Sequence, residues 1–171
     1  MTRLAYGLVL ALGLGAMPAF AQSALPDLIG KYRDWTAYEV TERGVKTCYM
    51  ISEPTDSKPE GVNRGDIHFF VSHRPAQKVE SEINIQIGYP FKAGSLGSLK
   101  IGGAKFQLYT ANQDAWLEDA KDEPRALNAM RKGSDMIISG ESKRGTRTTD
   151  TYSLLGFTAA LNAINKACGV R

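Results

Sequence analysis

The sequence predicts a mainly β protein with one short internal helix and a C-terminal helix packed on the sheet. The clearest strand pattern covers residues 79–89, where apolar and polar side chains alternate almost without exception. A period of two with one apolar face is typical of a strand that covers a core on one side and contacts water on the other. Other runs rich in aromatic and β-branched residues, and a C-terminal stretch with a helical apolar stripe, complete the prediction.

The other strands are expected from their composition and from the turns between them. Gly102 and Gly103 separate two short apolar runs, and paired glycines accept the positive φ that a tight hairpin turn requires. Arg144 and Gly145 take the same place between two later runs. The expected strands are residues 35–40, 47–51, 67–73, 99–101, 104–109, 136–142 and 146–152.

Two helices are expected in the second half of the chain. Asp122 is suited to cap the first, which turns Leu127 and Met130 inward and ends with cationic residues before Gly133. The second covers residues 153–168, because its apolar residues recur at steps of three and four along one stripe. Those residues are Leu154, Phe157, Leu161, Ile164 and Cys168.

The stretch RGTRTTDTYSLLGF, residues 144–157, combines glycine, arginine, threonine and aspartate as a phosphate-binding loop does. Such a loop needs several glycines and a lysine at the helix start, and the stretch has neither. We interpret it as a turn, an exposed strand of alternating threonines, and a helix cap. Ser153 or Asp150 is expected to accept the free amides of the first helical turn.

The first 21 residues are expected to be a signal peptide. Arg3 precedes an apolar run, and Ala19-Phe20-Ala21 has the small-x-small pattern of a cleavage site, so cleavage is expected between Ala21 and Gln22. The apolar run is shorter than the roughly 20 residues of a membrane anchor. Residues 22–171 are therefore expected to form a single exported domain without a transmembrane span, located in the periplasm, at the outer membrane or outside the cell.

Charge gives little direction to the choice of partner. Without Arg3 the chain has 20 Lys and Arg residues against 18 Asp and Glu. This bias is too small to indicate nucleic acid or an anionic membrane as the partner.

The search for catalytic and metal-binding residues assigns none. The histidines, His68 and His73, are five residues apart and fall on opposite faces of a regular strand. No cysteine pair has zinc-binding spacing, and no G-x-S-x-G motif is present. No cofactor is indicated, and the ligand-binding residues are unknown. Because a catalytic triad is assembled in space, an envelope enzyme stays an alternative.

Arg64-Gly65-Asp66 is a tripeptide that some host-cell receptors recognise. The alternative is that it closes the polar loop 52–65 and leads into the next strand, with the glycine meeting a backbone requirement. Three-residue matches arise easily by chance, so the second interpretation is preferred.

Cys48 and Cys168 are the only cysteines, and an exported protein folds where disulfides form. Cys168 shares the apolar stripe of the C-terminal helix, and Cys48 lies in an expected strand. A helix packed across that strand brings the two within bonding distance, so an intramolecular disulfide is expected. The alternative is two separate thiols, one of them paired with another protein.

Seven short motifs, spread over nearly the whole mature chain, together resemble the invasion-associated locus B protein family. They are Asp34-Trp35, Cys48-Tyr49-Met50, His73-Arg74-Pro75, Arg144-Gly145-Thr146, Asp150-Thr151-Tyr152-Ser153-Leu154, Gly156-Phe157 and Ala167-Cys168-Gly169. The resemblance implies an exported bacterial protein with an immunoglobulin-like β-sandwich and no known catalytic residues.

The leading hypothesis is therefore a non-catalytic domain that binds another envelope or host protein, in host association or in envelope upkeep. The alternatives are a periplasmic enzyme and a protein that binds a small apolar ligand between its sheets.

Overall fold

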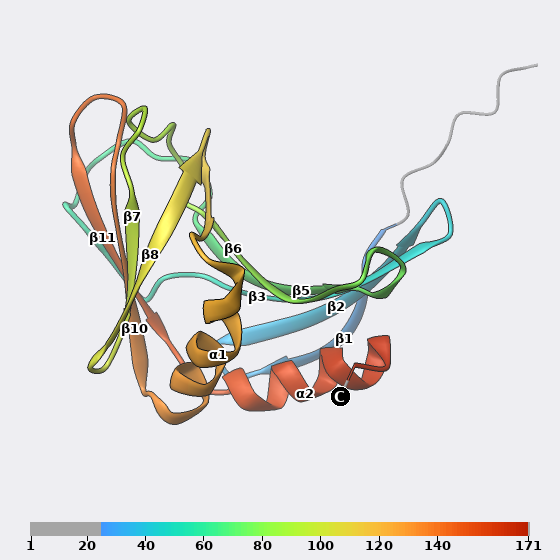
Figure 1. Ribbon diagram of the computed structural model, residues 1–171. Helices are drawn as coiled ribbons and strands as arrows, with labels where there is room; N and C mark the ends of the chain where they lie inside the picture. Colours follow the sequence, from blue (N-terminus) through green and yellow to red (C-terminus); the bar gives the residue numbers. More distant parts are fainter. Residues whose placement is uncertain (1–24, 171) are drawn as a thin grey trace, which may run out of the picture.

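The computed structural model describes residues 25–170, so the expected signal peptide and the Ala21–Gln22 cleavage site lie outside the described residues. Eleven strands form one sheet in the order β1-β2-β3-β5-β6-β9-β8-β7-β10-β11-β4 (Figure 1). Every strand pair is antiparallel. The strands are β1 (Asp27–Tyr32), β2 (Trp35–Glu42), β3 (Val45–Ser52), β4 (Asp56–Lys58), β5 (His68–Arg74), β6 (Val79–Gln86), β7 (Gly97–Ile101), β8 (Ala104–Ala111), β9 (Asp114–Leu117), β10 (Asp135–Glu141) and β11 (Arg147–Ser153).

The sheet folds over so that its two halves face each other. Phe69 on β5 and Tyr152 on β11 are far apart in the strand order, yet their ring centroids lie 5.9 Å apart. The indole of Trp35 on β2 also donates a hydrogen bond to the carbonyl of Ser153 on β11, at 3.0 Å. The expected mainly β fold with two helices is confirmed, and the arrangement is consistent with a β-sandwich with helices.

The core lies between these halves and follows the alternation in the sequence. Ile83 and Ile85 on β6 are fully buried, whereas Asn84 and Gln86, which alternate with them, are only partly buried. The strand was expected to continue to residue 89, but it ends at Gln86. Ile87 and Tyr89 are nevertheless buried, as the alternation predicts.

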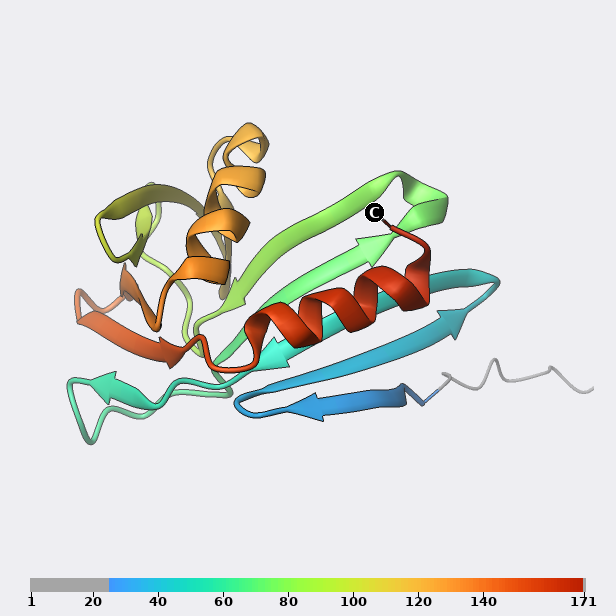
Figure 2. The same ribbon diagram turned by 90° about the horizontal axis from the view of Figure 1, so that it is seen from below.

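Two helices cover the inner face of the sheet. Helix α2 (Phe157–Cys168) packs on β1, β2, β3 and β5, and Figure 2 shows it lying across these strands. Helix α1 (Glu123–Lys132) stands beside it, buries Ala126 and Met130, and contacts β6, β7 and β8. Leu127, also expected to point inward, is partly buried against the core. Short 3₁₀ turns at Pro75–Gln77 and Ala120–Asp122 complete the described elements.

The caps expected for the C-terminal helix, Ser153 or Asp150, are wrong. Helix α2 starts at Phe157, four residues later than expected, after Gly156 at φ 91°. A side chain at Gly156 would collide with the backbone carbonyl of Tyr32, so the close approach of β1 fixes this start. Ser153 ends β11 instead and accepts a hydrogen bond from the amide of Leu155.

Asp122 is the N-cap residue of α1, as expected, but its side chain makes no capping hydrogen bond there. The side chain of Asp119 accepts from the amide of Lys121 one turn earlier. Because the 3₁₀ turn at Ala120–Asp122 leads directly into the helix, the capping site moves to the residue before that turn.

Strand β11 is also not the exposed strand expected from its threonines. Thr148, Asp150 and Tyr152 are buried, and Arg147, Thr149 and Thr151 form the outer face. The opposite half of the sandwich covers the inner face of β11. The polar residues of this strand gave no indication of that burial. Strands β1, β4 and β9 were not expected, because they are short or carry few β-branched residues.

Candidate functional site

Cys48 and Cys168 form the disulfide expected from the sequence, with an S–S distance of 2.00 Å and 6.0 Å between their Cα atoms. The bond joins β3 to the last residue of α2, across 120 residues of chain. Since both ends lie in packed elements, the bond fastens the helix to the sheet and has a structural role.

The two histidines lie on opposite faces of β5, as predicted. His73 is fully buried, its Nδ1 accepts the amide of Ser81 at 2.9 Å, and its Nε2 donates to Oδ1 of Asn165 at 2.8 Å. Burial lowers the pKa of His73 below 6.5, partly offset by the hydrogen bond to Asn165 and the charge of Glu80. A neutral imidazole therefore ties β5 to α2.

His68 lies on the outer face near Gln86 and Glu53. Across residues 25–170, no group of three or more His, Cys, Asp or Glu side chains is placed to hold a metal ion.

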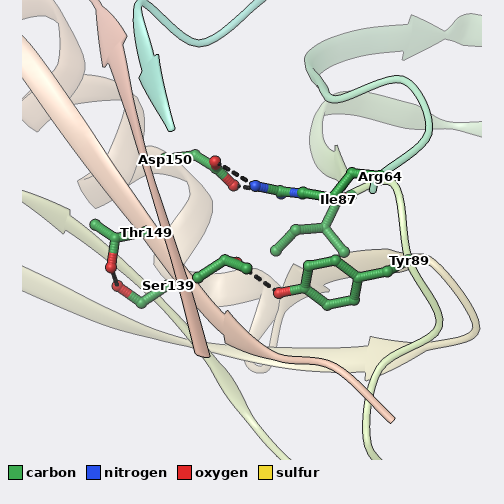
Figure 3. Close-up of polar contacts among 7 residues, drawn as sticks. Arg64, Ile87, Tyr89, Ser139, Thr149 and Asp150 are labelled. Carbon is green, nitrogen blue, oxygen red and sulfur yellow. Dashed lines mark hydrogen bonds and ion pairs between the residues drawn. The ribbon is translucent and has the colours of Figure 1, made fainter. Parts of the chain in front are cut away.

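A polar cluster inside the sandwich has Arg64 and Asp150 at its centre (Figure 3). The guanidinium donates two hydrogen bonds to the carboxylate, each 2.7 Å long, and two more to the carbonyl oxygen of Ile87. The side chains of Arg64 and Asp150 are 6% and 0% exposed. Nearby, the Tyr89 ring lies 5.1 Å from the guanidinium, and its hydroxyl hydrogen-bonds to Thr148 at 2.6 Å.

This cluster decides two questions that the sequence raised. Arg64 of the Arg64-Gly65-Asp66 tripeptide forms an ion pair with the buried carboxylate of Asp150, so the tripeptide does not present a free arginine to a receptor. Asp150 pairs with Arg64 and is not a helix cap. The cluster fastens the loop before β5 to strand β11, and we assign it a structural role.

The outer face of the first half of the sheet has a different character. Five aromatic side chains, none of them buried, lie on this face in two groups separated by Asn84 on β6: Tyr38 on β2, Tyr49 on β3 and Phe70 on β5, and then Trp116 on β9 and Tyr109 on β8. We call them the aromatic face. Neighbouring rings lie close together, with centroid distances of 5.4 Å for Tyr38–Tyr49, 6.3 Å for Tyr49–Phe70 and 6.4 Å for Tyr109–Trp116.

Two shallow depressions lie on either side of the ridge formed by Tyr49 and Phe70. The larger, about 690 Å³, extends past Tyr38 toward Arg33 and Glu53. The smaller, about 390 Å³, lies between the ridge and Trp116, with Asn84 at its floor.

The polar groups of the smaller depression are largely paired with each other. Arg74 forms a 2.8 Å ion pair with Glu82, and the amide of Asn84 donates to Asp114 at 3.4 Å. Burial, and next the neighbouring Tyr38, raises the pKa of Tyr49 above 10.0, so its hydroxyl stays protonated near neutral pH.

The sequence contained part of the signal for this surface. Tyr38, Tyr49 and Phe70 occupy the outward positions of strands whose inward positions are apolar, where polar residues are usual. The sequence did not place Trp116 on this surface, because its strand, β9, was not expected.

The comparisons with known proteins identify a family. The family model for the invasion associated locus B (IalB) protein matches residues 35–165. No curated protein and no solved structure gives a significant match. Within residues 25–170, the structure contains no helix with the length and apolar character needed to span a membrane. Because the family model covers most of the chain, including the aromatic face, the protein belongs to the invasion associated locus B (IalB) family.

Proposed function

We propose that this protein is an exported, non-catalytic domain of the bacterial cell envelope that binds another protein through its aromatic face. Export is supported by the signal-peptide pattern of residues 1–21 and by the disulfide, since such bonds persist in oxidising compartments. The family is not known as an enzyme family.

The exposure of the aromatic face is the observation that carries the proposal. Tyr109 is 55% exposed, and the other four rings are partly exposed, although the sheet has a fully buried face for apolar side chains. Tyr, Trp and Phe are enriched in the centres of protein interfaces, where they supply contact area at a small cost in conformational entropy. Two neighbouring groups of such rings on one face, surrounded by polar groups, are typical of a binding surface.

The structure supplies no comparable support for catalysis. Arg64, Asp150 and His73, whose side chains are buried, are paired inside the core and not placed in an open cleft. Their interactions join one element of the fold to another.

Site-specific photo-crosslinking in the producing cells tests the proposal. A crosslinking amino acid replaces Tyr109 on the aromatic face or, as the control, Arg147, which is 88% exposed on the outer face of β11. We expect Tyr109 to capture a defined protein that Arg147 does not, and we expect Trp116→Ala to reduce that capture. Equal capture from both positions would refute the aromatic face as the binding surface.

Cell fractionation tests export separately. The tagged full-length protein is expected in the periplasmic or outer-envelope fraction, shortened after Ala21. Recovery of the uncleaved chain in the inner membrane would contradict it.

A further inference from the structure

We propose that the segment bound by the aromatic face is an uncharged, proline-rich stretch in the polyproline II conformation. This inference rests on the proposed binding function and names the chemistry of the partner. Three observations carry it: the width of the smaller depression, the hydrogen-bonding groups that are free around it, and the balance of charges.

The smaller depression is one ring wide. Phe70, Asn84 and Trp116 lie directly opposite one another on β5, β6 and β9, so the two aromatic residues are separated by two strand spacings, about 10 Å. A flat ring between two others needs a van der Waals contact of about 3.5–4.0 Å on each side. The space above Asn84 therefore admits a single flat group such as a pyrrolidine ring.

The Tyr49–Phe70 ridge divides this depression from the larger one. A polyproline II helix repeats every three residues, about 9 Å along its axis. Prolines one turn apart can therefore enter the two depressions on either side of the ridge. Aromatic ridges separated by narrow grooves are the general means by which proteins recognise this conformation.

The face offers free hydrogen-bond donors to a ligand. Within residues 25–170, the tryptophan and tyrosine side chains that hydrogen-bond are Trp35 and Tyr89, so the Trp116 indole and the Tyr49 hydroxyl keep their donors for a ligand. A polyproline II segment makes no internal hydrogen bonds and presents carbonyl acceptors.

The charges of the face indicate an uncharged ligand. The two depressions are lined by three cationic and four anionic side chains, Lys31, Arg33 and Arg74 against Asp34, Glu53, Glu82 and Asp114. Because this near balance produces no strong field of either sign, a phosphorylated or polyanionic partner gains little attraction here.

The test is a titration of the purified mature protein, with its disulfide intact, followed by amide and indole nuclear magnetic resonance signals. The probes are a capped decaproline peptide, a capped Gly-Ser decapeptide of equal length, and a neutral hexasaccharide of N-acetylglucosamine. We expect decaproline alone to shift the Trp116 indole signal and the amides around Tyr49 and Phe70.

Variants separate the binding role from effects on folding. Trp116→Ala is expected to weaken decaproline binding at least tenfold, and Tyr49→Phe, which removes only a hydroxyl, is expected to weaken it severalfold with an otherwise unchanged spectrum. Arg147→Ala on the opposite outer face is the control and should bind as the unmodified protein does.

Two outcomes would overturn the inference: no decaproline shift at the aromatic face, or shifts from the hexasaccharide in its place. The photo-crosslinking from Tyr109 then tests the proposed function independently of the ligand chemistry. A partner captured there without decaproline binding refutes only the proline-rich chemistry, whereas failure of both experiments refutes the binding surface itself.

Discussion

Replacing Asp150 by asparagine should destabilise the fold strongly, although the substitution changes little in size. The carboxylate is fully buried and receives both terminal nitrogens of Arg64 at 2.7 Å. Removing its charge leaves a guanidinium that is itself 6% exposed without a counter-charge. Breaking a buried pair in this way costs about 3–5 kcal/mol of unfolding free energy, much of the stability of an ordinary domain.

The measurement is urea denaturation followed by circular dichroism, with the disulfide intact. Lys46→Met is the control, because the Lys46–Glu39 pair at 2.7 Å is 42% and 36% exposed, and such pairs contribute about 0–1 kcal/mol.

A double variant shows whether the loss comes from the pair itself. Arg64→Met with Asp150→Leu removes both charges, so it should be less destabilised than the sum of its single variants. It should still lose about 1–3 kcal/mol, because the carbonyl of Ile87 loses its donors. A loss below about 1 kcal/mol for Asp150→Asn, or strict additivity of the two single changes, would refute the buried pair.

Three further predictions concern the disulfide, pH and the core. Cys168→Ser opens a link across 120 residues and should cost up to about 5 kcal/mol in the chain-entropy model, seen as a lower melting temperature; an unchanged melting temperature would contradict it. The lowered pKa of His73 means that the unfolded chain binds the proton more readily, so stability should be full above about pH 6.5 and fall below it; His73→Gln should flatten this part of the pH profile, and an unaltered profile would count against it. Ile85→Asp should unfold the domain, because it places an unpaired charge at a fully buried position, whereas Gln86→Asp should be mild; similar melting curves for the two would refute the assignment of faces.

Alternation along a strand identifies its buried face when that face is apolar, as in β6. The sequence of β11 alternates with the same period of two. Its inward residues are Thr148, Asp150 and Tyr152, and because two of them are polar, the pattern did not predict that this face is buried. The position of Asp150 depends on Arg64, 86 residues earlier in the chain. Nothing in the local sequence of either residue marks the other as its partner.

The sequence by itself indicated the mainly β class, the apolar stripe of the C-terminal helix and the family, and it made a disulfide between its two cysteines the expectation that the structure confirms. Periodicity suffices for the class and the stripe, because local geometry repeats along the chain, whereas the family rests on the resemblance of short motifs. The tertiary structure decided where α2 begins, since the carbonyl of Tyr32 approaches Gly156 too closely for any other residue. It also decided that Arg64 is buried and that Trp116 lies two strands from Phe70 on the aromatic face. These contacts join segments distant in the chain, and they arise only when the sheet folds over and fixes its strand order.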